Sequence, residues 1–140
     1  MPPFGFEDDR MCFACGKDNP DGLQLEFEFD GENARTSVTF PGKFQGYHDI
    51  VHGGLVSTVL DETMVTLVNK LGYLALTAEL SVRFREPVHV GERIDVTARL
   101  VAKRGKIFTL EAMAAREDGT EVASAESRCF QVGLVQRAAS

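Results

Sequence analysis

The fold is decided by a stretch near the middle of the chain, residues 53–72, which reads GGLVSTVLDETMVTLVNKLG. Its apolar side chains recur every three or four positions, as they do along a helix: Leu55, Val56, Val59, Leu60, Met64, Leu67, Val68 and Leu71. This spacing predicts a helix of about 19 residues that is stopped by Gly72. Since the apolar surface is broad, we expect the rest of the chain to wrap around this helix.

Alternating apolar and polar residues on either side of the helix predict β-strands with one buried face. Two strands precede the helix and four follow it, at residues 23–29, 34–40, 78–84, 93–101, 107–115 and 122–132. In the third of these strands we expect Leu80, Val82 and Phe84 to face inward. The last four strands are expected to form a meander because short turn signals separate them. One long helix against an antiparallel sheet is an α+β fold.

The composition is that of an ordinary globular domain, with 140 residues, of which 44% are hydrophobic and 26% charged. Residues 1–22 lack periodicity, and we interpret them as an N-terminal leader packed on a single domain of residues 23–140. The net charge of −6 argues against a nucleic-acid partner. We expect neither a membrane span nor a signal peptide. Three cysteines are too few for a disulfide scaffold, so we expect a cytoplasmic protein.

The residues His52-Gly53-Gly54 lie where the predicted helix begins. A helix start leaves backbone N–H groups without partners and carries the positive end of the helix dipole. Glycine at this place lets a ligand approach the backbone closely. The three residues are therefore candidates for holding an anion, or a carbonyl oxygen that gains charge during a reaction. The alternative is a tight entry turn without a ligand.

Asp61 is the second candidate, because a carboxylate in the middle of an apolar helix is costly unless it is paired or used. The alternative is that Asp61 faces a polar seam and bonds to a neighbouring hydroxyl. It lies eight residues after Gly53, which is roughly 12 Å along a helix axis, too far for one helix to bring both groups to one carbonyl. If both serve one site, that site needs antiparallel helices from two copies of the chain, and we expect a two-fold homodimer.

The motif His52-Gly-Gly, with Asp61 nine positions after the histidine, resembles the hotdog-fold acyl-CoA thioesterases, in particular the phenylacetate-pathway (PaaI-like) group. Residues 76–88, LTAELSVRFREPV, are similar to one strand of that group. Residues 12–23, CFACGKDNPDGL, recur in some of its bacterial members. The resemblance spans about residues 12–132 of this chain. It implies a single-domain hotdog fold, in which an antiparallel sheet wraps around a long central helix.

The resemblance also implies the chemistry, which is hydrolysis of an acyl-CoA thioester without a metal or a bound cofactor. Asp61 would act as general base for water or as nucleophile, and Thr77 would help to hold the attacking water. The backbone N–H of Gly53 or Gly54 from the other subunit would polarise the thioester carbonyl, and His52 would shape the site.

The chain departs from the family pattern shortly before the motif. Several members carry an asparagine about six residues before the histidine, where this chain has Gly46. The neighbouring Gln45 is a candidate for supplying the missing amide to the substrate.

Other residues are candidates for contacts with the substrate rather than for the chemistry. Arg83 and Arg85 share one strand face, and Arg104 and Lys106 form a basic hairpin tip; either pair could meet the phosphates of CoA or simply be solvated. Met64 on the central helix is a candidate for the acyl pocket. The acyl group itself stays open between aliphatic and aromatic chains.

The Cys12-x-x-Cys15 pair could suggest zinc or redox chemistry. Zinc needs about four ligands, and Cys129 is the one thiol that remains, so we interpret the pair as structural packing.

Two further functions stay open at this point. One is a hotdog hydratase or dehydratase of 3-hydroxyacyl thioesters, with His52 as acid or base. The other is an acyl-CoA-binding protein without catalysis, since a fold does not guarantee an activity. The resemblance also implies that dimers pair into a tetramer.

Overall fold

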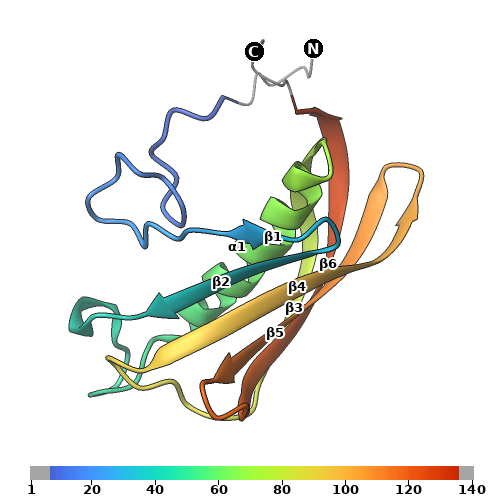
Figure 1. Ribbon diagram of the computed structural model, residues 1–140. Helices are drawn as coiled ribbons and strands as arrows, with labels where there is room; N and C mark the ends of the chain where they lie inside the picture. Colours follow the sequence, from blue (N-terminus) through green and yellow to red (C-terminus); the bar gives the residue numbers. More distant parts are fainter. Residues whose placement is uncertain (1–6, 136–140) are drawn as a thin grey trace.

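The computed structural model describes residues 7–135 and contains one long helix and a six-stranded sheet (Figure 1). Helix α1 spans Gly53–Lys70, and a short 3₁₀ helix, η1, spans Gly42–Phe44. The strands are β1 (Glu28–Phe29), β2 (Asn33–Thr39), β3 (Tyr73–Phe84), β4 (Arg93–Arg104), β5 (Ile107–Arg116) and β6 (Glu121–Leu134). All paired strands run antiparallel, which confirms the predicted α+β class.

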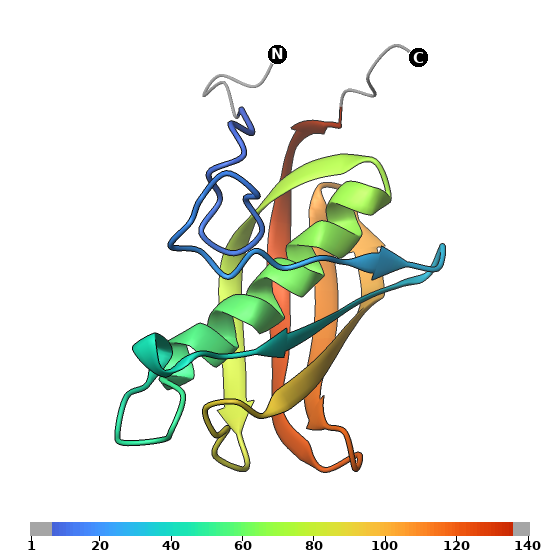
Figure 2. The same cartoon turned by 60° about the vertical axis from the view of Figure 1, so that its left-hand side comes forward.

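Helix α1 is the centre of the molecule, as its broad apolar surface predicted. Seven of its residues are buried: Val56, Val59, Leu60, Thr63, Met64, Leu67 and Val68. The chain leaves the helix through Gly72, whose φ of 106° lies in the left-handed region that favours glycine. The sheet curves around the helix, with β1 and β2 passing over one side and β3 and β6 lying on the other (Figure 2). This is the hotdog fold that the family resemblance implies.

The order of strands in the sheet is β1-β2-β4-β5-β6-β3, so the meander prediction is correct for β4, β5 and β6 and wrong for β3. Strand β3 pairs with β6 at the sheet edge and not with β4, its neighbour in sequence. The two are joined by residues 85–92 rather than by a tight turn. Eight extended residues reach about 26 Å, whereas three strand spacings amount to about 14 Å. The connection is therefore long enough to pass β6 and β5.

The first predicted strand, residues 23–29, is shortened to Glu28–Phe29. Gln24 has a positive φ of 51°, which interrupts the extended backbone. The backbone around it bonds to the leader, since Leu23 N–H donates to Phe13 O at 2.8 Å and Leu25 N–H to Ala14 O at 2.9 Å. Leu25 is buried, as the alternating pattern predicted, but its backbone pairs with the leader and not with β2.

Strand β3 presents apolar side chains toward α1. Its register pairs three of them with buried residues of β6: Leu80 with Ser127, Val82 with Ala125 and Phe84 with Ala123. The predicted inward orientation is therefore correct. Because β3 is an edge strand, α1 leaves it partly uncovered, and 39% of Leu80 and 53% of Phe84 stay exposed.

The described part of the leader, residues 7–22, lies against α1 and η1 (Figure 2). Ala14 is buried, and the ring of Phe13 meets that of Phe44 edge-on at a centroid distance of 6.4 Å. Residues 1–6 and 136–140, which the predicted leader and domain include, lie outside the described residues. Among residues 7–135, no helix has the length and apolar character needed to cross a membrane.

Candidate active site

The start of helix α1 is built by His52, Gly53 and Gly54. His52 is the N-cap, and its Nδ1 accepts a hydrogen bond from Gly54 N–H at 3.0 Å, while its carbonyl accepts from Leu55 N–H at 2.9 Å. Within residues 7–135, Gly53 N–H has no hydrogen-bond acceptor. An unpaired donor at the positive end of a helix suits an oxygen that carries negative charge. The geometry thus distinguishes Gly53, whose N–H is open, from Gly54, whose N–H is taken by His52.

Gly53 also lies close to its neighbour on β3. A Cβ atom at Gly53 would lie 3.3 Å from Cζ of Phe84, closer than most such contacts. Gly46 lies on the other side of the cap, where a Cβ would be 3.5 Å from the backbone of His52. The helix start is therefore flanked by Phe84 on one side and by the preceding loop on the other.

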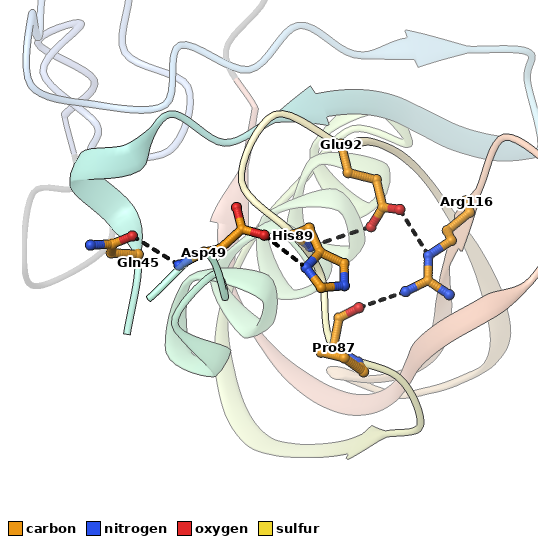
Figure 3. Close-up of polar contacts among 6 residues, drawn as sticks. All are labelled: Gln45, Asp49, Pro87, His89, Glu92 and Arg116. Atoms are coloured by element: carbon orange, nitrogen blue, oxygen red, sulfur yellow. Dashed lines mark hydrogen bonds and ion pairs between the residues drawn. The ribbon is translucent and has the colours of Figure 1, made fainter. Parts of the chain in front are cut away.

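That preceding loop, residues 45–52, is held in place by the connection between β3 and β4 (Figure 3). Asp49 Oδ2 meets His89 Nδ1 at 3.2 Å, and Asp49 N–H donates to Gln45 Oε1 at 3.1 Å. Backbone bonds join the same segments, with Val51 N–H donating to Val88 O at 2.8 Å. The amide of Gln45 therefore serves the loop itself in this structure, and its predicted contact with substrate remains a prediction.

The connection is fixed in turn by Arg116 of β5, whose Nε donates to Glu92 at 2.9 Å while its Nη2 donates to Pro87 O at 2.7 Å (Figure 3). Glu92 also accepts from His89 N–H at 3.3 Å. A chain of polar contacts thus runs from the sheet to the loop that carries His52.

Asp61 lies halfway along α1 and is partly exposed. Its Oδ1 accepts a hydrogen bond from Thr77 Oγ1 at 2.7 Å, so the structure brings together two residues that the sequence separates by sixteen positions. Thr77 lies at an irregularity in β3, where the register with β6 shifts between Thr77 and Glu79. Such bulges re-aim a side chain, and here the shift coincides with the residue that meets the carboxylate.

The surroundings of this pair are closed by Cys129 of β6. Its Sγ is 3.9 Å from Thr77 Oγ1, and its side chain is buried. Burial raises the pKa of the Cys129 thiol, and the charge of Asp61 adds to the effect. Burial and a raised pKa disfavour Cys129 as a nucleophile.

The structure does not bring the two halves of the expected site together within one chain. Gly53 is the first residue of α1 and Asp61 its ninth, which places them roughly 12 Å apart along the axis. The carboxylate and the open N–H group thus lie at different places on one helix.

The remaining predicted contacts lie elsewhere. Met64 has no exposed surface and accepts a hydrogen bond from Ser127, so in the single chain it belongs to the core and not to a pocket. Arg83 and Arg85 line a hollow of about 630 Å³ on the outer face of the sheet, away from α1, and Arg85 pairs with Glu121 at 3.1 Å.

The basic hairpin tip lies at the far end of the helix. Arg104 and Lys106 flank Gly105 between β4 and β5, and the neighbouring Lys103 lies 5.2 Å from the ring of Tyr73, just beyond the end of α1. Their role in binding the phosphates of CoA remains a prediction.

One contact was missed from the sequence. Glu62, the neighbour of Asp61, turns to the leader, where its Oε1 meets Cys15 Sγ at 3.0 Å and Cys12 Sγ at 3.8 Å. Cys12-x-x-Cys15 was a visible signal, but the third member comes from another element, about 50 positions away.

A sequence model of the thioesterase superfamily matches residues 48–123, which is more than half of the 140 residues. No curated protein sequence matches the chain significantly.

Solved structures with the same fold include three that share most of this chain. A Streptococcus mutans protein bound to acetyl-CoA has a TM-score of 0.76 and 18% identity, over 80% of this chain and 91% of that one. The PaaI protein from the phenylacetic acid degradation operon of E. coli has a TM-score of 0.76 and 18% identity, over 81% and 83%. A thioesterase superfamily protein has a TM-score of 0.81 and 25% identity, over 86% and 60%. With its hotdog fold and the match of the family model, the chain belongs to the thioesterase superfamily.

Proposed function

We propose that the protein hydrolyses acyl-CoA thioesters to the free acid and CoA, with Asp61 at the centre of the reaction. The observation that carries this proposal is the hydrogen bond of 2.7 Å from Thr77 to Asp61 on a partly exposed part of the central helix. It orients one carboxylate oxygen and leaves the other for a water molecule. The thioesterase superfamily supplies the reaction class.

The mechanism follows from where the protons are held. Because Thr77 donates its proton to Oδ1 of Asp61, Oδ2 is the oxygen that can take a proton from water, while the Thr77 oxygen can accept a hydrogen bond from the same water. The resulting hydroxide attacks the thioester carbonyl carbon, and the oxygen gains negative charge. The C–S bond then breaks and the thiolate of CoA leaves, taking up a proton from Asp61 or solvent. Direct attack by Asp61 as nucleophile would need the same carboxylate.

The charge on the carbonyl oxygen needs a donor, and the N–H of Gly53 is the open one at the helix start. A preorganised backbone N–H at such a place accounts for a large part of catalysis in acyl transfer. If Gly54 N–H also donates to the carbonyl oxygen, it must first give up its hydrogen bond to His52 Nδ1.

Because Asp61 and Gly53 are far apart on one helix, we propose that each site is shared by two chains in a two-fold homodimer. Strand β3 supports this arrangement, since it is a long edge strand with backbone groups open for pairing. Its exposed Leu80 and Phe84 add an apolar surface beside α1. In an antiparallel pair, the basic tip with Arg104 and Lys106 would lie near the helix start of the partner, where it could meet the phosphates of CoA.

A further pairing of dimers into a tetramer is supported by the outer face of the sheet. Leu76, Phe130 and Ile107 lie in one row across β3, β6 and β5, and each is more than a third exposed. A row of exposed apolar side chains on the outer face of a sheet suits contact with another sheet.

The test is thiol release from a panel of aliphatic and aromatic acyl-CoA substrates, with the native protein beside Asp61→Asn. Loss of a general base costs about 10²–10⁴ in rate, so we expect a drop of that size. Glu117→Gln, an exposed carboxylate in the β5–β6 turn, is the matched control and should keep the native rate. Equal rates for native protein and Asp61→Asn would refute the role of Asp61.

The same panel separates the rival functions. Hydration of a crotonyl-type CoA, seen as loss of the enone absorbance, would identify a hydratase. Tight acyl-CoA binding without thiol release from any substrate would identify a binding protein.

A further inference from the structure

The two cysteines of the leader and Glu62 of α1 form a cluster that the proposed reaction does not use. Each residue offers one possible ligand atom: a sulfur from each cysteine and a carboxylate oxygen from Glu62. These three atoms all lie within 4.8 Å of one another, and all three side chains are partly buried. Ligand atoms around a tetrahedral zinc ion are about 3.5–3.8 Å apart, from bond lengths of about 2.0–2.3 Å. The observed separations from Glu62 Oε1 are 3.0 Å to Cys15 and 3.8 Å to Cys12, so small shifts would complete the geometry.

The turn that carries the cysteines is built independently of any ion. Gly16 N–H donates to Cys12 O at 2.8 Å and closes the turn. A Cβ at Gly16 would lie 2.4 Å from the Cys12 nitrogen, so no other residue fits there. Bonds from Leu23 and Leu25 to the backbone of Phe13 and Ala14 hold the same turn from outside. The two sulfurs are therefore presented together on a preformed backbone.

The charges around the cluster call for a cation. Within residues 7–135, Glu62 has no salt-bridge partner, and its side-chain hydrogen bonds are those with the two thiols. The two basic residues of the leader turn elsewhere, since Arg10 pairs with Asp18 at 3.1 Å and Lys17 with Glu26 at 3.0 Å. A partly buried carboxylate with two thiols and no counter-charge is a donor set that a metal ion would satisfy.

From this juxtaposition we propose that Cys12, Cys15 and Glu62 bind one divalent transition-metal ion, with Zn²⁺ as the best match. Two sulfurs and one carboxylate are a borderline-soft set that suits zinc and disfavours Mg²⁺ and Ca²⁺. The protein supplies three ligands and water the fourth. The ion ties the leader to α1 at the residue next to Asp61, and this role is independent of the proposed hydrolysis.

A redox role for the cysteine pair fits the surroundings less well. Thiol–disulfide exchange needs a thiolate, which a nearby positive charge stabilises. Here burial, and then the neighbouring Glu62, raise the pKa of the Cys15 thiol. A reactive thiolate is therefore disfavoured unless a cation is bound, and a metal ion would supply that positive charge.

The experiment is titration of the reduced, metal-free full chain with Co²⁺ and then Zn²⁺. We expect one equivalent of Co²⁺ to give a sulfur-to-metal charge-transfer band and tetrahedral d–d bands, and Zn²⁺ to remove them by displacement. Cys15→Ser should lose the bands. Glu62→Gln should weaken Zn²⁺ binding by about tenfold or more, since even outer partners of a metal contribute 10–100-fold.

Cys129→Ala is the matched control, because it removes a thiol from outside the cluster and should keep one equivalent of bound metal. To separate binding from misfolding, the melting temperature of native protein and Cys129→Ala should rise with Zn²⁺ and fall with a chelator. Absence of stoichiometric Co²⁺ and Zn²⁺ binding to the reduced native chain would overturn the proposal, as would bands that persist in Cys15→Ser. A Cys12–Cys15 disulfide that forms readily while no metal binds would assign the pair to redox chemistry instead.

Discussion

The hydrogen bond from Thr77 distinguishes the two oxygens of the Asp61 carboxylate. Thr77 Oγ1 donates its proton to Oδ1 across an oxygen–oxygen distance of 2.7 Å, which restrains the carboxylate and leaves its second oxygen for water in the proposed reaction. Within residues 7–135, Asp61 has no ion-pair partner, and Thr77 has no charged partner besides Asp61. In the proposed reaction the pair would therefore act as a positioned base and not as part of a surface ion-pair network.

Replacing Thr77 tests this positioning. Thr77→Val keeps the shape and removes the hydroxyl, and we expect kcat to fall about ten- to a hundredfold, because a hydrogen bond to a charged group is worth about 1.5–3 kcal/mol. Thr77→Ser retains the hydroxyl and should stay close to native. The measurement is kcat and KM for thiol release in both variants. Native kcat in Thr77→Val would show that the hydroxyl has no part in the reaction.

Gly53 allows the backbone donor to be removed by itself. Gly53→Pro deletes one N–H, and proline suits the first position of a helix. The preceding His52 has φ −59° and ψ 129°, which a following proline tolerates. We expect kcat to fall by about 10²–10³, the usual effect of losing one such donor. Gly53→Ala brings a Cβ toward Phe84 but keeps the N–H, so a much smaller loss in this control would assign the effect to the donor.

At the scale of elements, the helix start depends on the connection between β3 and β4. Arg116 and Glu92 are well covered, with 21% and 27% of their side chains exposed, and the guanidinium also holds Pro87 O. The loop of residues 45–52 packs on this connection through Asp49 and His89. The support of His52 is thus an inter-element network and not a property of the helix alone.

This network gives a stability prediction. Arg116→Gln should lower the free energy of unfolding by about 1–2 kcal/mol, because it removes the charged donor to the partly buried Glu92 carboxylate and the donor to Pro87 O. Arg99→Gln breaks the exposed pair with Glu111, where 62% and 38% of the side chains are exposed, and should cost less than about 1 kcal/mol. Urea unfolding of both variants checks the difference, and equal losses would contradict it.

The elements also show which parts of the fold the sequence could predict. Helix α1 and the strands after it were predictable because their periodicity reports burial directly. The edge position of β3 was not, since alternation says nothing about which strand lies alongside. The short β1 was missed because residues 23–25 pair with the leader, a contact between segments that periodicity cannot detect.

The same limit applies to the site. Asp61, Thr77 and the His52-Gly53-Gly54 start were identified from residue type, position and resemblance, and the structure places Thr77 on Asp61. Glu62 was not singled out from the sequence, because its partners come from the leader. Met64 was placed in a pocket because apolar helix positions give no sign of which face meets the ligand; it is fully buried.

At the scale of the whole molecule, the proposal takes the two helical groups of each site from different copies of the chain. The 18 residues of α1 carry the open N–H at one end and the carboxylate halfway along. Each proposed site therefore needs Gly53 from one chain and Asp61 from its partner.

This division makes the two defects complementary. A mixture of Asp61→Asn and Gly53→Pro chains, each inactive as a homodimer, forms heterodimers after subunit exchange. In such a heterodimer one site receives both defects and the other receives neither. With equal amounts and random exchange, half of the dimers are mixed, so about a quarter of native activity should return. A mixture that stays inactive after demonstrated exchange would mean that both groups act within one chain. Recovered activity would mean that each site takes one group from each chain.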